Sequence, residues 1–163
     1  MKRTSKIVVL ALVICVTLSA FTSCQSKSTV ADSGTAKIVI ENAENDYTVY
    51  EVDLSKLENR SEGVMSLLEY VAMLEGSELY YNVQWGGGYG AYVTSIGTLV
   101  PDSTCQYVSI YTTEASDFAV PTDYAPTVAT VKYGDITLTY SGVGMSSMHV
   151  NDGTVILFRI ESF

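Results

Sequence analysis

The sequence predicts an α+β domain in which one helix packs on a mixed β-sheet. Two patterns lead to this fold class. Apolar residues recur at helical spacing only between residues 64 and 74, whereas the other apolar stretches after residue 36 alternate with polar residues, as half-buried strands do. One helix laid across such strands is an α+β plan. Residues 36–163 are therefore expected to form one folded domain.

Eight short strands are expected around the helix. The first two should form a hairpin, because a polar turn separates them, and the last one follows the turn triplet Asn151-Asp152-Gly153. The segment 113–127 contains two prolines and is expected to cross the sheet surface as a loop. The expected strands are 37–41, 47–53, 79–85, 92–96, 107–111, 128–132, 136–140 and 154–160.

The helix is expected over residues 64–74. Its apolar side chains share one face, which should cover the sheet. Ser61 and Glu62 are typical of a helix start, and Gly76 is typical of a helix end. The residues on the predicted face are Val64, Leu67, Leu68, Val71 and Leu74.

Residues 1–23 have the pattern of a secretion signal. Three basic residues precede an apolar run at 7–16, which is shorter than the roughly 20 apolar residues that a membrane-spanning helix needs. The segment Phe21-Thr22-Ser23-Cys24 resembles a bacterial lipobox, in which cleavage leaves an acylated cysteine as the new N-terminus. Cys24 is therefore the expected lipidation site. The alternative is an ordinary secretion signal that ends near Ala20 and leaves Cys24 free.

Residues 24–35 are small and polar, without periodicity, so they are expected to form a flexible tether between Cys24 and a domain that starts near Ala36. Each buried methylene of an acyl chain contributes about 0.8 kcal/mol to membrane binding, so several chains anchor a protein without any spanning helix. The expected location is the extracellular face of the cell membrane.

The charge balance excludes one class of partner. Removing the signal removes three basic residues and no acidic ones, so six basic residues then face 18 acidic residues and the net charge changes from −9 to −12. Nucleic-acid binding needs a positive surface, and an acidic domain is repelled by anionic lipid. Membrane contact should therefore come from the lipid anchor alone. Cys105 would be the remaining thiol, expected to be half-buried and inert.

Three stretches of the folded region resemble a known family. The stretches are 63–68 (GVMSLL), 88–97 (GYGAYVTSIG), and 142–145 (GVGM) through 150–155 (VNDGTV). The order of hairpin, helix and strands is similar to a β-grasp domain. With these stretches, the chain more narrowly resembles bacterial lipoprotein domains related to the C-terminal domain of transcobalamin and intrinsic factor. The resemblance implies a β-grasp-like fold and cobalamin or a related corrinoid as the ligand.

Aromatic residues gather around the glycines at 86–90 and give the candidate binding site. Tyrosine and tryptophan offer broad, rigid surfaces to planar rings, sugars or proteins, although in strands they also serve as cross-strand packing. The candidate ligand-binding residues are Trp85, Tyr89 and Tyr92. Tyr89 lies between two glycines and is expected to be an exposed contact, whereas Tyr92, inside an alternating strand, is expected to support stability first.

No pattern in the sequence predicts catalysis, a resident cofactor or a metal. His149 is the single histidine, and Ser146 and Ser147 beside it lack a nucleophile-elbow motif. The glycines at 86–90 are not followed by the Lys-Ser/Thr of a phosphate loop. The acidic residues at 41–46 lack the spacing of a calcium loop. The sequence therefore predicts a non-enzymatic binding lipoprotein, for which the resemblance suggests a corrinoid ligand. The alternative is a protein-interaction or adhesion module.

Overall fold

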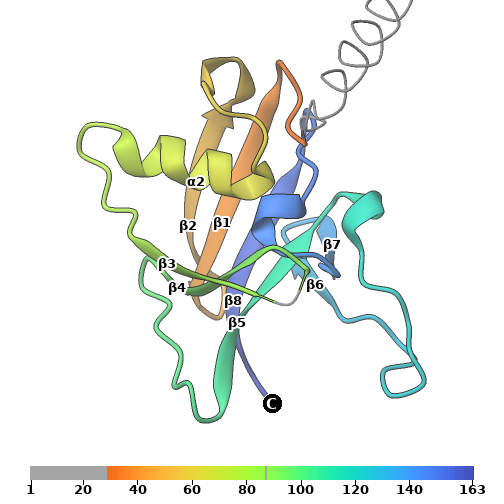
Figure 1. Cartoon of the computed structure of the whole chain (residues 1–163). Helices are drawn as coiled ribbons and strands as arrows, with labels where there is room; N and C mark the ends of the chain where they lie inside the picture. The colour runs from red at the N-terminus through yellow and green to blue at the C-terminus, as the bar shows by residue number, and fades with distance from the viewer. Residues whose placement is uncertain (1–28, 87) are drawn as a thin grey trace, which may run out of the picture.

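One α-helix and eight strands are formed by the residues that the computed structural model describes, 29–86 and 88–163 (Figure 1). The α+β class predicted from the sequence is confirmed. The helix is α2 (Gly63–Met73), and three short 3-10 helices are η1 (Leu54–Lys56), η2 (Ala115–Asp117) and η3 (Met145–Ser147). The strands are β1 (Thr35–Ala43), β2 (Asp46–Asp53), β3 (Tyr81–Trp85), β4 (Ala91–Ile96), β5 (Gln106–Thr112), β6 (Thr130–Tyr133), β7 (Ile136–Tyr140) and β8 (Val155–Ser162).

Six of the strands form one sheet in the order β2-β1-β8-β5-β7-β6. The sheet is mixed, as expected, because β1 and β8 run parallel and the other neighbours run antiparallel. The strands β3 and β4 pair only with each other and form a separate antiparallel ribbon. The helix α2 lies across β1 and β2, and the ribbon crosses the sheet beside it (Figure 1). The main core lies between the sheet and these two elements.

The apolar face of α2 is the face that the periodicity predicted. Val64, Leu67, Leu68 and Val71 are buried in the main core, whereas Leu74 lies just beyond the last helical residue and is exposed. The helix begins where the chain fits closely against η3. A Cβ atom at Gly63 would collide with backbone carbonyl oxygens of η3 and the residue after it, and the positive φ of 52° also favours glycine there.

The sheet is curled, so that its two edges meet. On β8, Ile156 and Phe158 contribute to the main core, while Val155 and Leu157 belong to a second cluster on the opposite face. This separation follows from the alternation of side chains along a strand. At the sheet edges, the rings of Tyr47 (β2) and Tyr133 (β6) lie edge to face with centroids 5.0 Å apart. The second cluster therefore fills the inside of the curl.

The folded part begins earlier than the expected boundary near Ala36. Val30 is buried in the main core and forms a parallel β-bridge with Val150. The amide of Ala31 donates to the Val150 carbonyl at 2.8 Å, and the Val150 amide donates to the Thr29 carbonyl at 2.8 Å. Part of the predicted tether is thus packed against the domain.

Several predictions fall on residues 1–28, which lie outside the described part of the chain. These are the signal at 1–23, the lipidation of Cys24 and the start of the tether. Among the residues that are described, no helix is both long and apolar enough to cross a membrane. The prediction of a half-buried Cys105 is wrong, because this thiol is exposed beside the turn that precedes β5.

Candidate functional site

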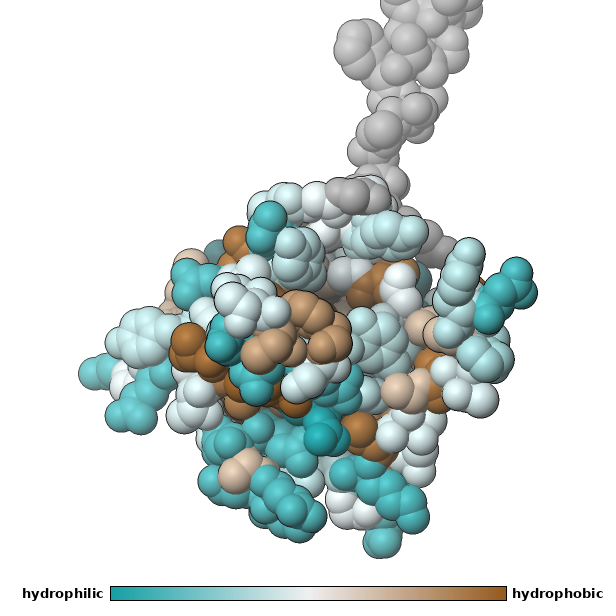
Figure 2. Space-filling model, turned by 90° about the horizontal axis from the view of Figure 1, so that it is seen from below, coloured by the Kyte–Doolittle hydropathy of each residue, from teal (hydrophilic) through white to brown (hydrophobic). Residues whose placement is uncertain are grey.

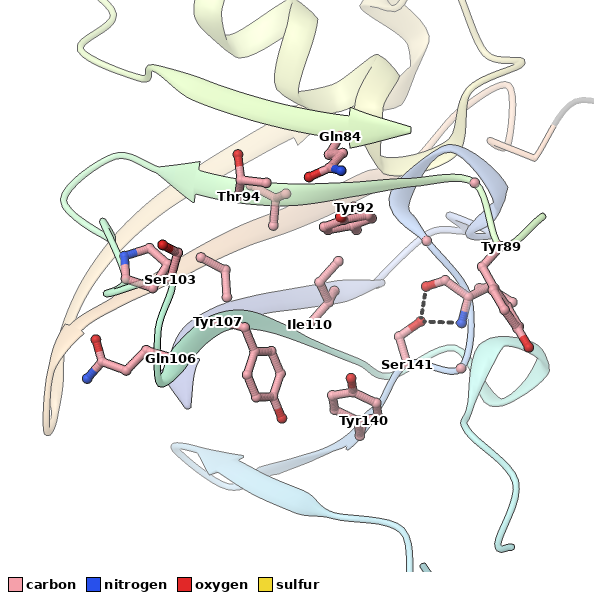
Figure 3. Close-up of a pocket in the computed structure, with 17 residues that line it drawn as sticks. Gln84, Tyr89, Tyr92, Thr94, Ser103, Gln106, Tyr107, Ile110, Tyr140 and Ser141 are labelled. Carbon is pink, nitrogen blue, oxygen red and sulfur yellow. Dashed lines mark hydrogen bonds between the residues drawn. The ribbon is translucent and has the colours of Figure 1, made fainter. Parts of the chain in front are cut away.

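A cavity of about 530 Å³ lies between the β3–β4 ribbon and the side of β5 that β7 leaves open. We call it the ribbon cavity. The residues that line it come from both strands of the ribbon and the turn between them, from β5 and the segment 101–103 before it, from Tyr140 at the end of β7 and from the segment 141–144 (Figure 3). None of these lining residues is charged. The cavity is therefore an uncharged, mainly apolar site with aromatic walls and a few polar groups.

The ribbon supplies the upper wall of the cavity. Because neighbouring side chains in a strand point to opposite faces, Ala91 and Val93 pack in the core while Tyr92 and Thr94 face the cavity, although Val93 also forms part of the cavity lining. Tyr92 points from β4 toward Ile110 of β5 across the cavity (Figure 3). Its side chain is 45% exposed, so Tyr92 is a cavity residue and not mainly the packing residue that we expected.

The three candidate binding residues do not share one surface. Tyr89 and Tyr92 both line the ribbon cavity, and Tyr89 is 70% exposed, as expected for a residue between glycines. Trp85 pairs with Ala91 in the ribbon, so it lies on the face opposite to Tyr92 and does not line the cavity. The sequence thus identified two of the lining residues, but it missed those of β5 and β7, which are distant in the chain.

Two tyrosines of the sheet, Tyr107 and Tyr140, form the lower wall (Figure 3). Burial raises the pKa of Tyr107 to about 12, with smaller contributions from Tyr140 and from Glu161, whose carboxylate accepts the Tyr107 hydroxyl at 3.2 Å. Burial also raises the pKa of Tyr140. Both hydroxyl groups therefore stay protonated at neutral pH. The Tyr107 hydroxyl already donates its proton to Glu161 and can only accept from a ligand, whereas the Tyr140 hydroxyl can donate to one.

The end of the cavity is held by contacts between two glycine-rich segments. The Gly144 amide donates to the Tyr89 carbonyl at 2.8 Å, and the Ala91 amide donates to Ser146 Oγ at 2.9 Å. A Cβ atom at Gly144 would collide with the carbonyl oxygens of Tyr89 and Ala91, so the close approach requires glycine. The stretches 88–97 and 142–145, which carried the family resemblance, therefore lie side by side in space.

His149 has a partner that the sequence did not indicate. Its Nδ1 lies 2.7 Å from Oδ1 of the buried Asp117, and its backbone amide donates to Oδ2 at 2.6 Å. The two residues are 32 positions apart, so no local pattern could pair them. Ser146, one of the two serines near His149 in the sequence, instead accepts a hydrogen bond from the Ala91 amide. The Asp117–His149 pair fastens η2 to the segment before β8 and does not line the ribbon cavity.

The acidic side chains do not assemble into a metal site in the described part of the chain, where no group of three or more histidine, cysteine, aspartate or glutamate residues lies close together. Glu41, one of the acidic residues near the first turn, pairs with Arg159 at 3.3 Å. Its carboxylate is thus engaged with a cation of the protein itself.

No protein-family model matches the chain, and no curated protein sequence matches it. Among solved structures, the chain is similar to a protein of Ruminococcus gnavus that has been suggested to bind metal. The two share 11% sequence identity, and the similarity covers 80% of this chain and 98% of the other, with a TM-score of 0.48. At this level the similarity does not bear on function.

Proposed function

We propose that the chain is a non-enzymatic binding lipoprotein, tethered through Cys24 to the extracellular face of the cell membrane, which holds its ligand in the ribbon cavity. The observation that carries this proposal is the cavity itself. Its volume of about 530 Å³ falls in the range of roughly 300–1,000 Å³ that is typical of ligand sites. Aromatic surfaces with a few polar groups are also typical of such sites.

The lining favours a ligand with planar, uncharged surfaces. Tyr92 and Tyr107 supply aromatic side chains on opposite sides of the cavity, and the protonated hydroxyl group of Tyr140 can orient a polar edge of the ligand. The family resemblance suggests cobalamin or a related corrinoid, together with a β-grasp-like fold. A hairpin followed by a helix that packs on a mixed sheet supports that fold assignment.

Two features support a binding role over catalysis. The residues that line the cavity include no histidine, cysteine, lysine or carboxylate that could act as a nucleophile or a general base. The Asp117–His149 pair, which has the hydrogen bond of a catalytic pair, lies away from the cavity, and its role in the fold is to fasten two segments.

The first experiment titrates the full-length chain, in nonionic detergent, with cyanocobalamin and follows the corrinoid absorbance. Binding should be at least about fivefold weaker for Tyr92→Ala, because truncating an aromatic residue that contacts the ligand centrally typically costs more than 1 kcal/mol. Trp85→Ala is the matched control, since it removes an exposed aromatic residue from the other face of the ribbon. If Tyr92→Ala binds as the parent does, the ligand does not occupy the ribbon cavity.

The tether is tested separately by metabolic labelling with a fatty acid. The parent chain should incorporate the label, and Cys24→Ala should not, because the lipidation pathway acts on that thiol. Equal labelling of both chains would refute the lipoprotein assignment.

A protein-interaction or adhesion module is the second candidate. Large apolar side chains are exposed at several places, and the face seen from below shows them as separate groups among polar atoms (Figure 2). Such a surface can contact a protein partner without forming one large hydrophobic patch. The exposed residues include Trp85, Tyr89, Val100, Tyr124 and Phe163.

A further inference from the structure

One side of β5 is left open along most of the strand. On its other side, β8 pairs with every residue from Gln106 to Thr112. On the open side, β7 pairs only with Tyr111 and Thr112 before it diverges. The stretch from Gln106 to Ser109 therefore has a sheet edge with no neighbouring strand in the described part of the chain.

The backbone groups on this edge can be assigned from the alternation of hydrogen bonds along a strand. The Cys105 carbonyl accepts the Phe163 amide, which continues the β8 side, whereas the Ile110 carbonyl accepts the Ser141 amide on the β7 side. Residues 106, 108 and 110 therefore direct their amides and carbonyls away from β8. The Gln106 amide donates a hydrogen bond to the Asp102 carbonyl, four residues earlier, at 2.7 Å. The N–H and C=O of Val108 and the C=O of Gln106 remain for another strand.

This edge of β5 opens into the ribbon cavity, and one wall of the cavity lies above the edge and the other below it. Gln106, Tyr107 and Val108 all line the cavity. Tyr92 lies above the edge, and Tyr107 and Tyr140 lie below it (Figure 3). A strand added beside β5 would point successive side chains alternately toward these two walls. The cavity thus offers both the backbone partners and the side-chain contacts that a single added strand needs.

We propose that the open edge of β5 binds an extended peptide segment by β-augmentation. The inference rests on the proposed function, because it places a ligand in the same cavity, and it names the chemistry of a protein partner there. In this mode of recognition, main-chain hydrogen bonds supply affinity and the walls select alternate side chains. An unpaired sheet edge is a template for such pairing.

The charges define the peptide further. None of the lining residues is charged, so the central residues of the peptide should be uncharged, since a charge in the cavity would lose hydration without gaining a partner. The chain as a whole carries a net charge of −9, which favours basic residues on either side of that centre. The partner is therefore an extended segment with uncharged, β-branched or aromatic central residues and basic flanks.

The test uses seven-residue fluorescent peptides with a lysine at each end and threonine alternating with valine or with tyrosine between them. Binding to the full-length chain in nonionic detergent is measured by anisotropy. Each central amide is then methylated in turn, so that the side chains stay the same while one donor is removed. Affinity should fall by about fivefold to tenfold at every second amide and change little at the amides between them, because only alternate amides face β5.

Hydrogen exchange provides a second measurement that needs no variant. In the free protein, the Val108 amide should exchange faster than the amides of Tyr107 and Ser109, which bond to β8. Saturating peptide should slow exchange at Val108 and leave its two neighbours unchanged. Methylation effects without alternation, or no protection of Val108 by either peptide at millimolar concentration, would overturn the proposal. The proposal would also be overturned if, in the absence of peptide, the Val108 amide became more protected as the protein concentration rises, since a second copy of the chain would then occupy the edge.

Cyanocobalamin, titrated into the same samples, separates this inference from the proposed corrinoid ligand. If the corrinoid binds and the peptides do not, the peptide inference fails while the cavity remains a small-molecule site. If the peptides bind with the alternating pattern and the corrinoid does not, the corrinoid fails alone. If both bind, each should displace the other, because they share one cavity; simultaneous binding would overturn the placement of the peptide.

Discussion

The replacement of Leu68 by alanine tests whether α2 packs on the sheet through its predicted apolar face and so stabilises the main core. Leu68 is fully buried, so the substitution removes apolar contact and leaves a cavity beneath the helix. Such a change costs about 2–5 kcal/mol, against a total stability of about 5–15 kcal/mol for a typical domain. At roughly 4 °C for each kcal/mol in a domain of this size, Tm should fall by about 8–20 °C.

The assay is thermal unfolding followed by far-ultraviolet circular dichroism. Met73→Ala is the matched control, because Met73 is the last residue of the same helix and its side chain is 84% exposed. That variant should unfold within about 0.5 kcal/mol of the parent. If Leu68→Ala also unfolds within a degree or two of the parent, α2 does not pack on the sheet through this face and the core assignment is refuted.

Three further predictions follow from contacts and pKa values. A chain that begins at Ala36 should unfold at a lower temperature than one that begins at Ser28, because it lacks the buried Val30; equal Tm values would show that this packing is dispensable. Above pH 10, tyrosines in the unfolded chain lose their protons, whereas Tyr107 in the folded chain keeps its proton until about pH 12. The free energy of unfolding, measured by chemical denaturation, should therefore fall between about pH 10 and pH 12, and it should fall less in Tyr107→Phe. A rise with pH would contradict the raised pKa of Tyr107. Asp117→Asn should lower the free energy of unfolding by about 1–3 kcal/mol, since it weakens a buried hydrogen-bonded group. The same change at the exposed Asp123, Asp123→Asn, should leave the free energy of unfolding nearly unchanged. Equal melting temperatures for the two variants would show that the Asp117 carboxylate does not stabilise the fold.

The elements themselves could be predicted from local patterns. The helix was expected at 64–74 and occurs at Gly63–Met73, because its buried side chains must repeat at helical spacing to share one face. Each of the eight strands occurs where alternation or a β-rich run predicted one, with shifts at the ends. The first hairpin turn is shorter than expected, since β1 and β2 continue until only two residues remain between Ala43 and Asp46. Turn length depends on cross-strand pairing, which alternation alone does not define.

The arrangement of the strands could not be predicted in the same way. Nothing in the local sequence of β3 and β4 distinguishes a separate ribbon from two more strands of the main sheet. The packing of Val30 depends on Val150, which lies 120 residues further along the chain. A single apolar residue in a polar segment carries no periodicity, so the segment was predicted to be a flexible tether. Contacts of this kind belong to the tertiary structure and leave no local signal.

The site shows the same division between what alternation reveals and what it leaves open. Alternation requires Trp85 and Tyr92 to lie on opposite faces of the ribbon, because Trp85 is the partner of Ala91. It does not say which face meets the core, and the small Ala91 and the branched Val93 are the residues that pack there. The larger aromatic ring of Tyr92 is thereby turned toward β5. Whether that ring contacts another strand or an open cavity then depends on β7, which pairs with β5 only at Tyr111 and Thr112. The cavity and the open edge thus have one origin, the early divergence of β7, and any ligand that fills the cavity must either use the backbone groups of Val108 or leave them to water.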